Sequence, residues 1–155
     1  MKWNFDGKIA LITGGASGIG RQIAMDMATS GASIAIFDVD AVQGNKTLGE
    51  LQAISKRSMR FFQGSVSNKT FVEETVQKIF KEMGEVDFLI NCAGVLRDFM
   101  IDKFDEKKWD ITIEVNLKGV AICTEAVATQ WAAISKAKAT EKGINIFQSL
   151  KTSRG

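Results

Sequence analysis

The chain has 155 residues, of which 45% are hydrophobic and 25% charged, and its formal net charge at pH 7 is +2. This length fits one domain with a hydrophobic core, and the small charge, spread over interleaved acids and bases, disfavours a nucleic-acid partner. Two cysteines and no histidine disfavour a disulfide framework and a metal site. No secretory signal and no membrane-length apolar run are present, so we expect a cytoplasmic protein with no membrane partner.

The first half of the chain alternates short apolar runs with amphipathic stretches. Residues Lys8–Thr13 (KIALIT) are expected to form a buried strand that leads into a glycine-rich turn. A helix ending at Gly31 follows, with its apolar face predicted at Ile19, Ile23 and Met27. Ser33–Phe37 is expected to be a second buried strand, and Met59–Gln63 a third. The helix between them takes its apolar face from Leu48, Leu51 and Ile54.

The second half continues the alternation. The most regular helical stripe consists of Val72, Val76, Ile79, Phe80 and Met83. Val86–Ile90 is expected to be a fourth buried strand. After a loop come two helical stretches, Trp109–Val115 and Leu117–Ile134. The second has Val120, Thr124, Val127, Trp131 and Ile134 on one side, which leaves Ile122 and Cys123 outside that line. Continuously apolar strands alternating with helices predict an α/β fold, a doubly wound parallel sheet of Rossmann type in a single domain over 1–155.

The turn after the first strand has the residues needed to bind phosphate. Thr13–Gly20 (TGGASGIG) lies between a buried strand and a helix start, where glycines let backbone amides approach a pyrophosphate closely. The alternative is a purely structural turn. Asp38, at the carboxyl end of the second strand, can accept the adenosine ribose hydroxyls and would repel a 2′-phosphate, which favours NAD over NADP. The alternative for Asp38 is a turn-forming residue.

Three ordered motifs resemble those of the short-chain dehydrogenase/reductase family. They are TGGASGIG, the segment Asn91–Gly94 (NCAG) after the fourth strand, and the segment Val115–Gly119 (VNLKG). The resemblance covers the chain from about Phe5 to Ala128. It implies an NAD(P)-dependent oxidoreductase that interconverts a small-molecule alcohol and a ketone, with 3-oxoacyl thioesters among the candidate substrates. The family also commonly forms homo-oligomers, and we expect dimers or tetramers built on the helices around 104–110 and 117–134.

The resemblance assigns roles residue by residue. Gly14, Ser17, Gly18, Ile19 and Gly20 would cradle the pyrophosphate, and Asp38 would bind the ribose. Ser65 and Val66 stand where the family often has an Asp-Val pair that contacts adenine, so a charged acceptor is lost there. Asn91, Ala93 and Gly94 would form the floor beneath adenine and nicotinamide, although Asn91 has an alternative role in stabilising the sheet. Cys92 is expected to be a packed small residue rather than a reactive thiol.

The catalytic part of the resemblance is incomplete. Asn116 would anchor a proton-relay water from a locally irregular helix, or would simply be a polar helix residue. Gly143–Leu150 (GINIFQSL) is interpreted either as a fifth strand carrying a catalytic Ser149 or as part of a polar insertion over 140–153. The family's Tyr-x-x-x-Lys pair has no counterpart, because the chain contains no tyrosine. We therefore expect a dinucleotide-binding domain that is truncated at its C-terminal end relative to the family, and a 155-residue chain that is inactive as an enzyme. The alternative is a non-catalytic nucleotide-binding or oligomerisation module.

Overall fold

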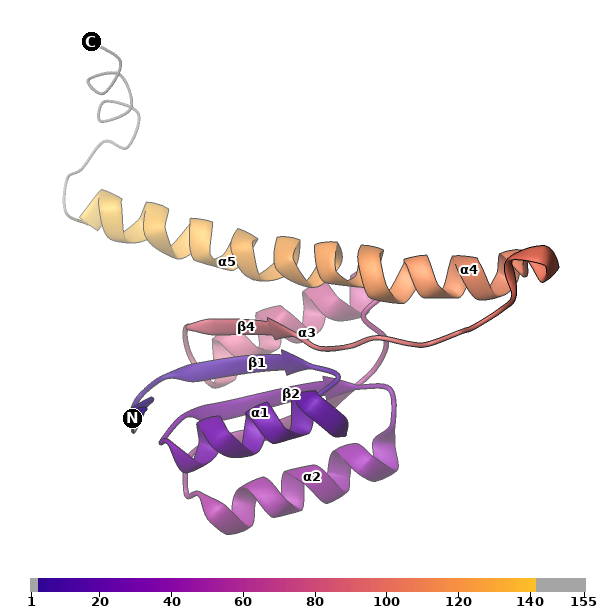
Figure 1. Cartoon of the computed structure of the whole chain (residues 1–155). Coiled ribbons are helices and arrows are strands. Elements are labelled where there is room, and N and C mark those ends of the chain that lie inside the picture. Colours follow the sequence, from indigo (N-terminus) through magenta and orange to yellow (C-terminus); the bar gives the residue numbers. More distant parts are fainter. Residues whose placement is uncertain (1–2, 142–155) are drawn as a thin grey trace.

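The computed structural model describes residues 3–141, which form a parallel sheet with helices on both faces (Figure 1). In this part of the chain the strand order is β3-β2-β1-β4. The elements are β1 (Ile9–Thr13), α1 (Gly18–Thr29), β2 (Ser33–Asp38), α2 (Ala41–Ile54), β3 (Met59–Gln63), α3 (Lys69–Glu82), β4 (Phe88–Asn91), the 3₁₀ turn η1 (Ile101–Lys103), α4 (Glu106–Ile113), the π-helical turn η2 (Glu114–Lys118) and α5 (Gly119–Glu141). The expected Rossmann-type α/β architecture is confirmed.

Strand β1 is the centre of the sheet, and all five of its residues are buried. It pairs with β2 along one edge and with β4 along the other, so Thr13 lies level with both Phe37 and Asn91. The expected strands are found, with β4 beginning two residues later than predicted. Just before the strand starts, the Asp87 carboxylate accepts the Ile9 N–H at 2.9 Å and the Lys8 ammonium at 2.8 Å.

Two hydrophobic layers enclose the sheet. One layer joins α1 and α2 to the sheet through residues such as Ala24, Met27 and Leu51. The other joins α3 and α5 to the opposite face through residues that include the predicted α3 stripe. Helix α5 packs against α3 and β4 on that face (Figure 1). This arrangement leaves the carboxyl ends of the parallel strands and the turns that follow them along one rim of the sheet.

The buried faces of α1 and α2 differ from the predicted ones. Ile19 is 77% exposed, and the buried face of α1 is formed by the residues Gly20, Ala24, Met27 and Ala28. In α2, Leu51 is buried as expected but Ile54 is exposed, and the small residues Gly44 and Thr47 are buried instead. Small side chains bring a helix backbone close to the sheet, and the spacing of large apolar residues does not indicate where this happens.

Helices α4 and α5 form one continuous rod through the π-helical turn η2 rather than two separate stretches (Figure 1). The expected stripe on α5 was wrong at two positions, since Val120 and Thr124 are exposed. The buried face consists of Ile122, Cys123, Ala126 and Val127. The contact begins at Gly119, where any side chain would collide with Val66, so α5 packs closely through small residues here as well.

Candidate functional site

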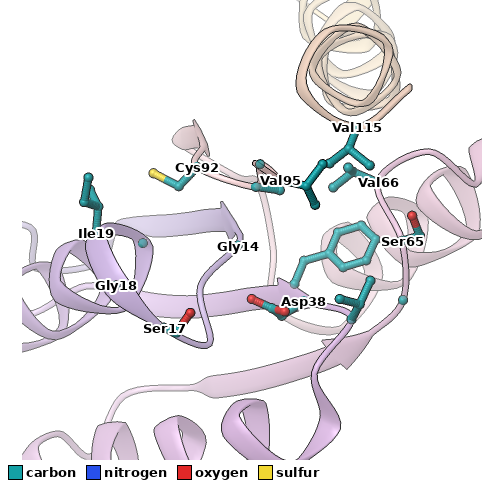
Figure 2. Close-up of a pocket in the computed structure, with 16 residues that line it drawn as sticks. Gly14, Ser17, Gly18, Ile19, Asp38, Ser65, Val66, Cys92, Val95 and Val115 are labelled. Atoms are coloured by element: carbon teal, nitrogen blue, oxygen red, sulfur yellow. The ribbon is translucent and has the colours of Figure 1, made fainter. Parts of the chain in front are cut away.

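A cavity of about 490 Å³ opens at the carboxyl ends of the strands, where the turns after β1, β2, β3 and β4 meet (Figure 2). Its lining residues are Gly14, Ser17, Gly18, Ile19, Gly20, Phe37, Asp38, Val39, Gly64, Ser65, Val66, Cys92, Ala93, Gly94, Val95 and Val115. All but one of the predicted cofactor-binding residues are therefore brought together, and Asn91 is the exception. A crevice of this kind, outside the carboxyl ends of parallel strands, is where open α/β sheets bind ligands.

The glycine-rich turn is packed tightly against the segment that follows β4. Gly14 has a φ of +64°, and a Cβ placed on it would lie 2.7 Å from the backbone of Ala93. The Thr13 hydroxyl oxygen ties the two segments together, because it accepts the N–H groups of Cys92 at 3.2 Å and Ala93 at 3.1 Å. Only glycine at position 14 is compatible with this left-handed, close-packed backbone.

The amino terminus of α1 differs from those of α2, α3 and α4. These three helices are capped by the side chains of Asp40, Asn68 and Asp105, each of which accepts a first-turn N–H. The N-cap residue of α1, Ser17, makes no such side-chain bond, and the first turn of α1 contains no acidic residue. Its amides lie instead at the cavity wall, and unsatisfied amides at a helix N-terminus attract anions.

Asp38 lies at the end of β2 and faces the cavity beside Ser17 and Gly14 (Figure 2). One carboxylate oxygen accepts the Ala16 N–H at 3.1 Å and the other accepts the Asp40 N–H at 3.1 Å. Of the described residues that line the cavity, Asp38 alone carries a charge. The arrangement can therefore accept hydroxyl groups at Asp38 and offers no lysine or arginine there for a further phosphate.

Asn91, which was predicted to form part of the floor, is not among the described residues that line the cavity. Its side chain lies on the same face of β4 as Leu89, which packs against the α3–α5 layer. The amide nitrogen of Asn91 is 3.4 Å from the hydroxyl oxygen of Thr124, and its side-chain oxygen is buried without a hydrogen-bond partner among the described residues. The alternation of side chains along the strand therefore favours the structural role that the sequence left open.

Asn116 lies within the π-helical turn, as the expected irregular helix required. Its amide forms a reciprocal pair with the backbone of Val95, accepting the Val95 N–H at 2.8 Å and donating to the Val95 carbonyl at 2.9 Å. The loop after β4 is thereby fixed next to the cavity, and the neighbouring Val115 lines it. Ser149 lies outside the described residues.

Six residues that line the cavity were not among the predicted site residues. They are Phe37, Val39, Gly64, Cys92, Val95 and Val115. Each is next in sequence to a predicted site residue at a strand end or in η2. That position beside a predicted residue was the one feature of the sequence that could have identified them. Cys92 is half-buried, and this burial raises the pKa of its thiol, in keeping with a packed side chain.

Two further properties concern the described residues only. Among them, no helix is long and apolar enough to cross a membrane. In the same part of the chain no three histidine, cysteine or carboxylate side chains gather in a way that could hold a metal ion.

Comparisons with known proteins identify relatives over most of the chain. A family model described as short chain dehydrogenase matches residues 8–144. A hydroxy(phenyl)methylsuccinyl-CoA dehydrogenase subunit of Thauera aromatica is 40% identical over 77% of this chain and 48% of its own length. The 3-oxoacyl-acyl-carrier-protein reductase of Escherichia coli is 35% identical over 80% of this chain and 49% of its own length. The chain therefore spans about half the length of these curated relatives.

A solved structure of a short-chain dehydrogenase also matches this chain in its three-dimensional fold. A short-chain dehydrogenase from Burkholderia cenocepacia, determined in complex with NADP, matches with a TM-score of 0.76 and 30% sequence identity. The match covers 81% of this chain and 51% of that one.

Proposed function

Because the chain belongs to the short-chain dehydrogenase family, we propose that its cavity binds NAD(H) and that the intact protein interconverts an alcohol and a ketone by hydride transfer. The observation that carries the proposal is the convergence of the uncapped α1 terminus, the close-packed glycine turn and Asp38 on one cavity. The relatives' names favour a small-molecule substrate, including 3-oxoacyl compounds. A cytoplasmic location remains a prediction.

The residues present fit a dinucleotide. The backbone amides at the start of α1 would hold the pyrophosphate, namely those of Ser17, Gly18, Ile19 and Gly20. They can do so because the N-cap side chain accepts no hydrogen bond from them. Asp38 would hold the adenosine ribose, and Ser65 and Val66 would border adenine. Ala93 and Gly94 would form the floor. When bound, the nicotinamide would supply or accept the hydride.

The Asp38 carboxylate at the cavity favours NAD over NADP in this proposal. A 2′-phosphate would meet the Asp38 carboxylate, and residues 3–141 place no lysine or arginine in the lining to offset the repulsion. A difference of ~2 kcal/mol corresponds to about thirtyfold in affinity. Calorimetric titration of the 155-residue protein with both oxidised cofactors tests this choice. Equal affinities, or tighter binding of NADP, would overturn the role of Asp38.

Proton transfer is a separate requirement. A positioned acid or base contributes typically ~10²–10⁴-fold to the rate, and the 155 residues contain neither histidine nor tyrosine. We propose that this chain binds cofactor but does not reduce ketones at a useful rate, with Asn116 and Ser149 insufficient by themselves. Turnover of NADH and a ketone panel should appear only in a protein extended through the downstream gene. Equal turnover by both proteins would place the catalytic group within these residues. Nucleotide binding without turnover in both would favour the non-catalytic module.

Exposed apolar residues on the rod formed by α4 and α5 support the expected assembly of this protein into a homo-oligomer. Four large apolar residues recur along its outer side at helical spacing and stay 36–65% exposed, namely Trp109, Ile113, Leu117 and Val120. Ile122 and Cys123, which were expected to leave apolar surface exposed, are buried instead. Val127 is buried as well, and the Trp131 indole donates to the Val86 carbonyl. We propose that a second copy covers the exposed side.

A further inference from the structure

A buried hydroxyl from α2 holds the glycine-rich turn. The Thr47 side chain is 1% exposed, and its hydroxyl donates to the carbonyl oxygen of Ala16 at 2.8 Å. Ala16 is also 1% exposed, and its carbonyl precedes the N-cap residue Ser17, outside the hydrogen-bond ladder of α1. A buried carbonyl in that position needs a partner from elsewhere in the chain. Thr47 provides it from a different helix.

Ala16 is held from its other side by Asp38. Its N–H donates to the Asp38 carboxylate at 3.1 Å, so both polar groups of this residue have side-chain partners. Helix α2 is itself fastened to the first turn of α1, because the Arg21 guanidinium donates two hydrogen bonds to Glu50 at 2.6 and 2.9 Å. The turn, the carboxylate and α2 thus form one connected unit next to the cavity.

We propose that Thr47 is a positioning residue for dinucleotide binding. It does not line the cavity, so it acts through Ala16, keeping the turn amides and the Asp38 carboxylate directed at the ligand. The inference rests on the proposed function for the identity of that ligand. The anchoring of the turn by Thr47 can be measured without any ligand.

The first experiment compares cofactor affinity in three variants. Thr47→Val keeps the side-chain volume but leaves the Ala16 carbonyl buried without its donor, whereas Thr47→Ser keeps the hydroxyl. Thr75→Val is the matched control, since Thr75 is also buried but lies in α3 on the opposite face of the sheet. Calorimetric titration with NADH and with ADP should show about tenfold weaker binding for Thr47→Val. Thr47→Ser and Thr75→Val should bind like the unmodified protein.

The second experiment follows amide hydrogen exchange at Ala16 and Ser17 by NMR without nucleotide. Exchange there should become about tenfold faster in Thr47→Val and stay unchanged in Thr75→Val. A lower unfolding midpoint with unchanged affinity and unchanged exchange would show that Thr47 only stabilises the fold, and would overturn the proposal. If the unmodified protein binds neither nucleotide, the proposed function fails. The exchange rates then decide the anchoring by themselves, and equal rates would refute it.

Discussion

Replacing Gly14 with alanine should damage both the stability of the protein and its nucleotide site. The left-handed φ of +64° alone costs an alanine roughly 1–2 kcal/mol. The new Cβ would also lie 2.7 Å from the Ala93 backbone, so the turn and the segment after β4 must separate. That movement strains the two hydrogen bonds to the Thr13 hydroxyl, each worth about 1 kcal/mol. The expected loss of unfolding free energy is therefore about 3–4 kcal/mol.

Urea denaturation at pH 7 measures this loss, and NADH titration of the folded protein measures the accompanying loss of affinity. The matched control is Gly49→Ala in α2, where an added Cβ meets nothing within 4 Å. Because alanine is the better helix former, this control should stabilise the protein by about 0.5–1 kcal/mol. An unfolding midpoint for Gly14→Ala at or above that of the unmodified protein would refute the argument that close backbone approach restricts this position to glycine.

Three further predictions concern other parts of the molecule. Desolvation raises the pKa of Asp87, but hydrogen bonds from Lys8 and from the Ile9 N–H outweigh it and leave the pKa below 3.8. The stabilisation is therefore present above that value and lost as the pH falls through the lowered folded-state pKa, so Asp87→Asn should cost about 1 kcal/mol at pH 7 and progressively less as the pH falls below 3.8 in urea denaturation. Burial raises the pKa of the Cys123 thiol to about 11, so at pH 8 this thiol should resist modification by an aromatic disulfide reagent. The half-buried thiol of Cys92 should react slowly with the same reagent, and NADH should protect it. Leu117→Glu should shift light scattering from oligomer to monomer, and an unchanged mass would exclude the α4–α5 side as the contact.

The strand pattern and the turn chemistry could be read from the sequence because both depend on local features. Continuously apolar runs predicted the four strands, and the glycine spacing together with Asp38 predicted where the cavity lies. The helix faces could be read only in part. Ile19 and Ile54 were expected inside, but the structure buries Gly20 and Thr47, since small residues set how closely a helix approaches the sheet.

Contacts that depend on the meeting of distant segments could not be predicted at all. The pairing of Asn116 with the Val95 backbone joins residues 21 apart, and that of Thr47 with Ala16 joins residues 31 apart. The motif around Asn116 indicated a functional residue but not its partner Val95, and the neighbours of Thr47 in sequence gave no signal for either its role or its partner. Asn91 was placed at the cavity floor by its motif, whereas the alternation of β4 turns it towards α5.

The position of β1 between β2 and β4 has a consequence for how the chain folds during synthesis. One edge of β1 pairs with the next strand, but the other waits for a segment far downstream, as in the contact between Ile9 and Asp87, 78 residues apart. At about 5–20 residues per second, a ribosome needs on the order of 4–16 s to make that stretch. Throughout this interval β1, whose five residues are all buried in the folded protein, has an unpaired edge, which is open to other nascent chains. We therefore expect chaperones to bind the growing polypeptide before β4 emerges from the ribosome and to release it afterwards.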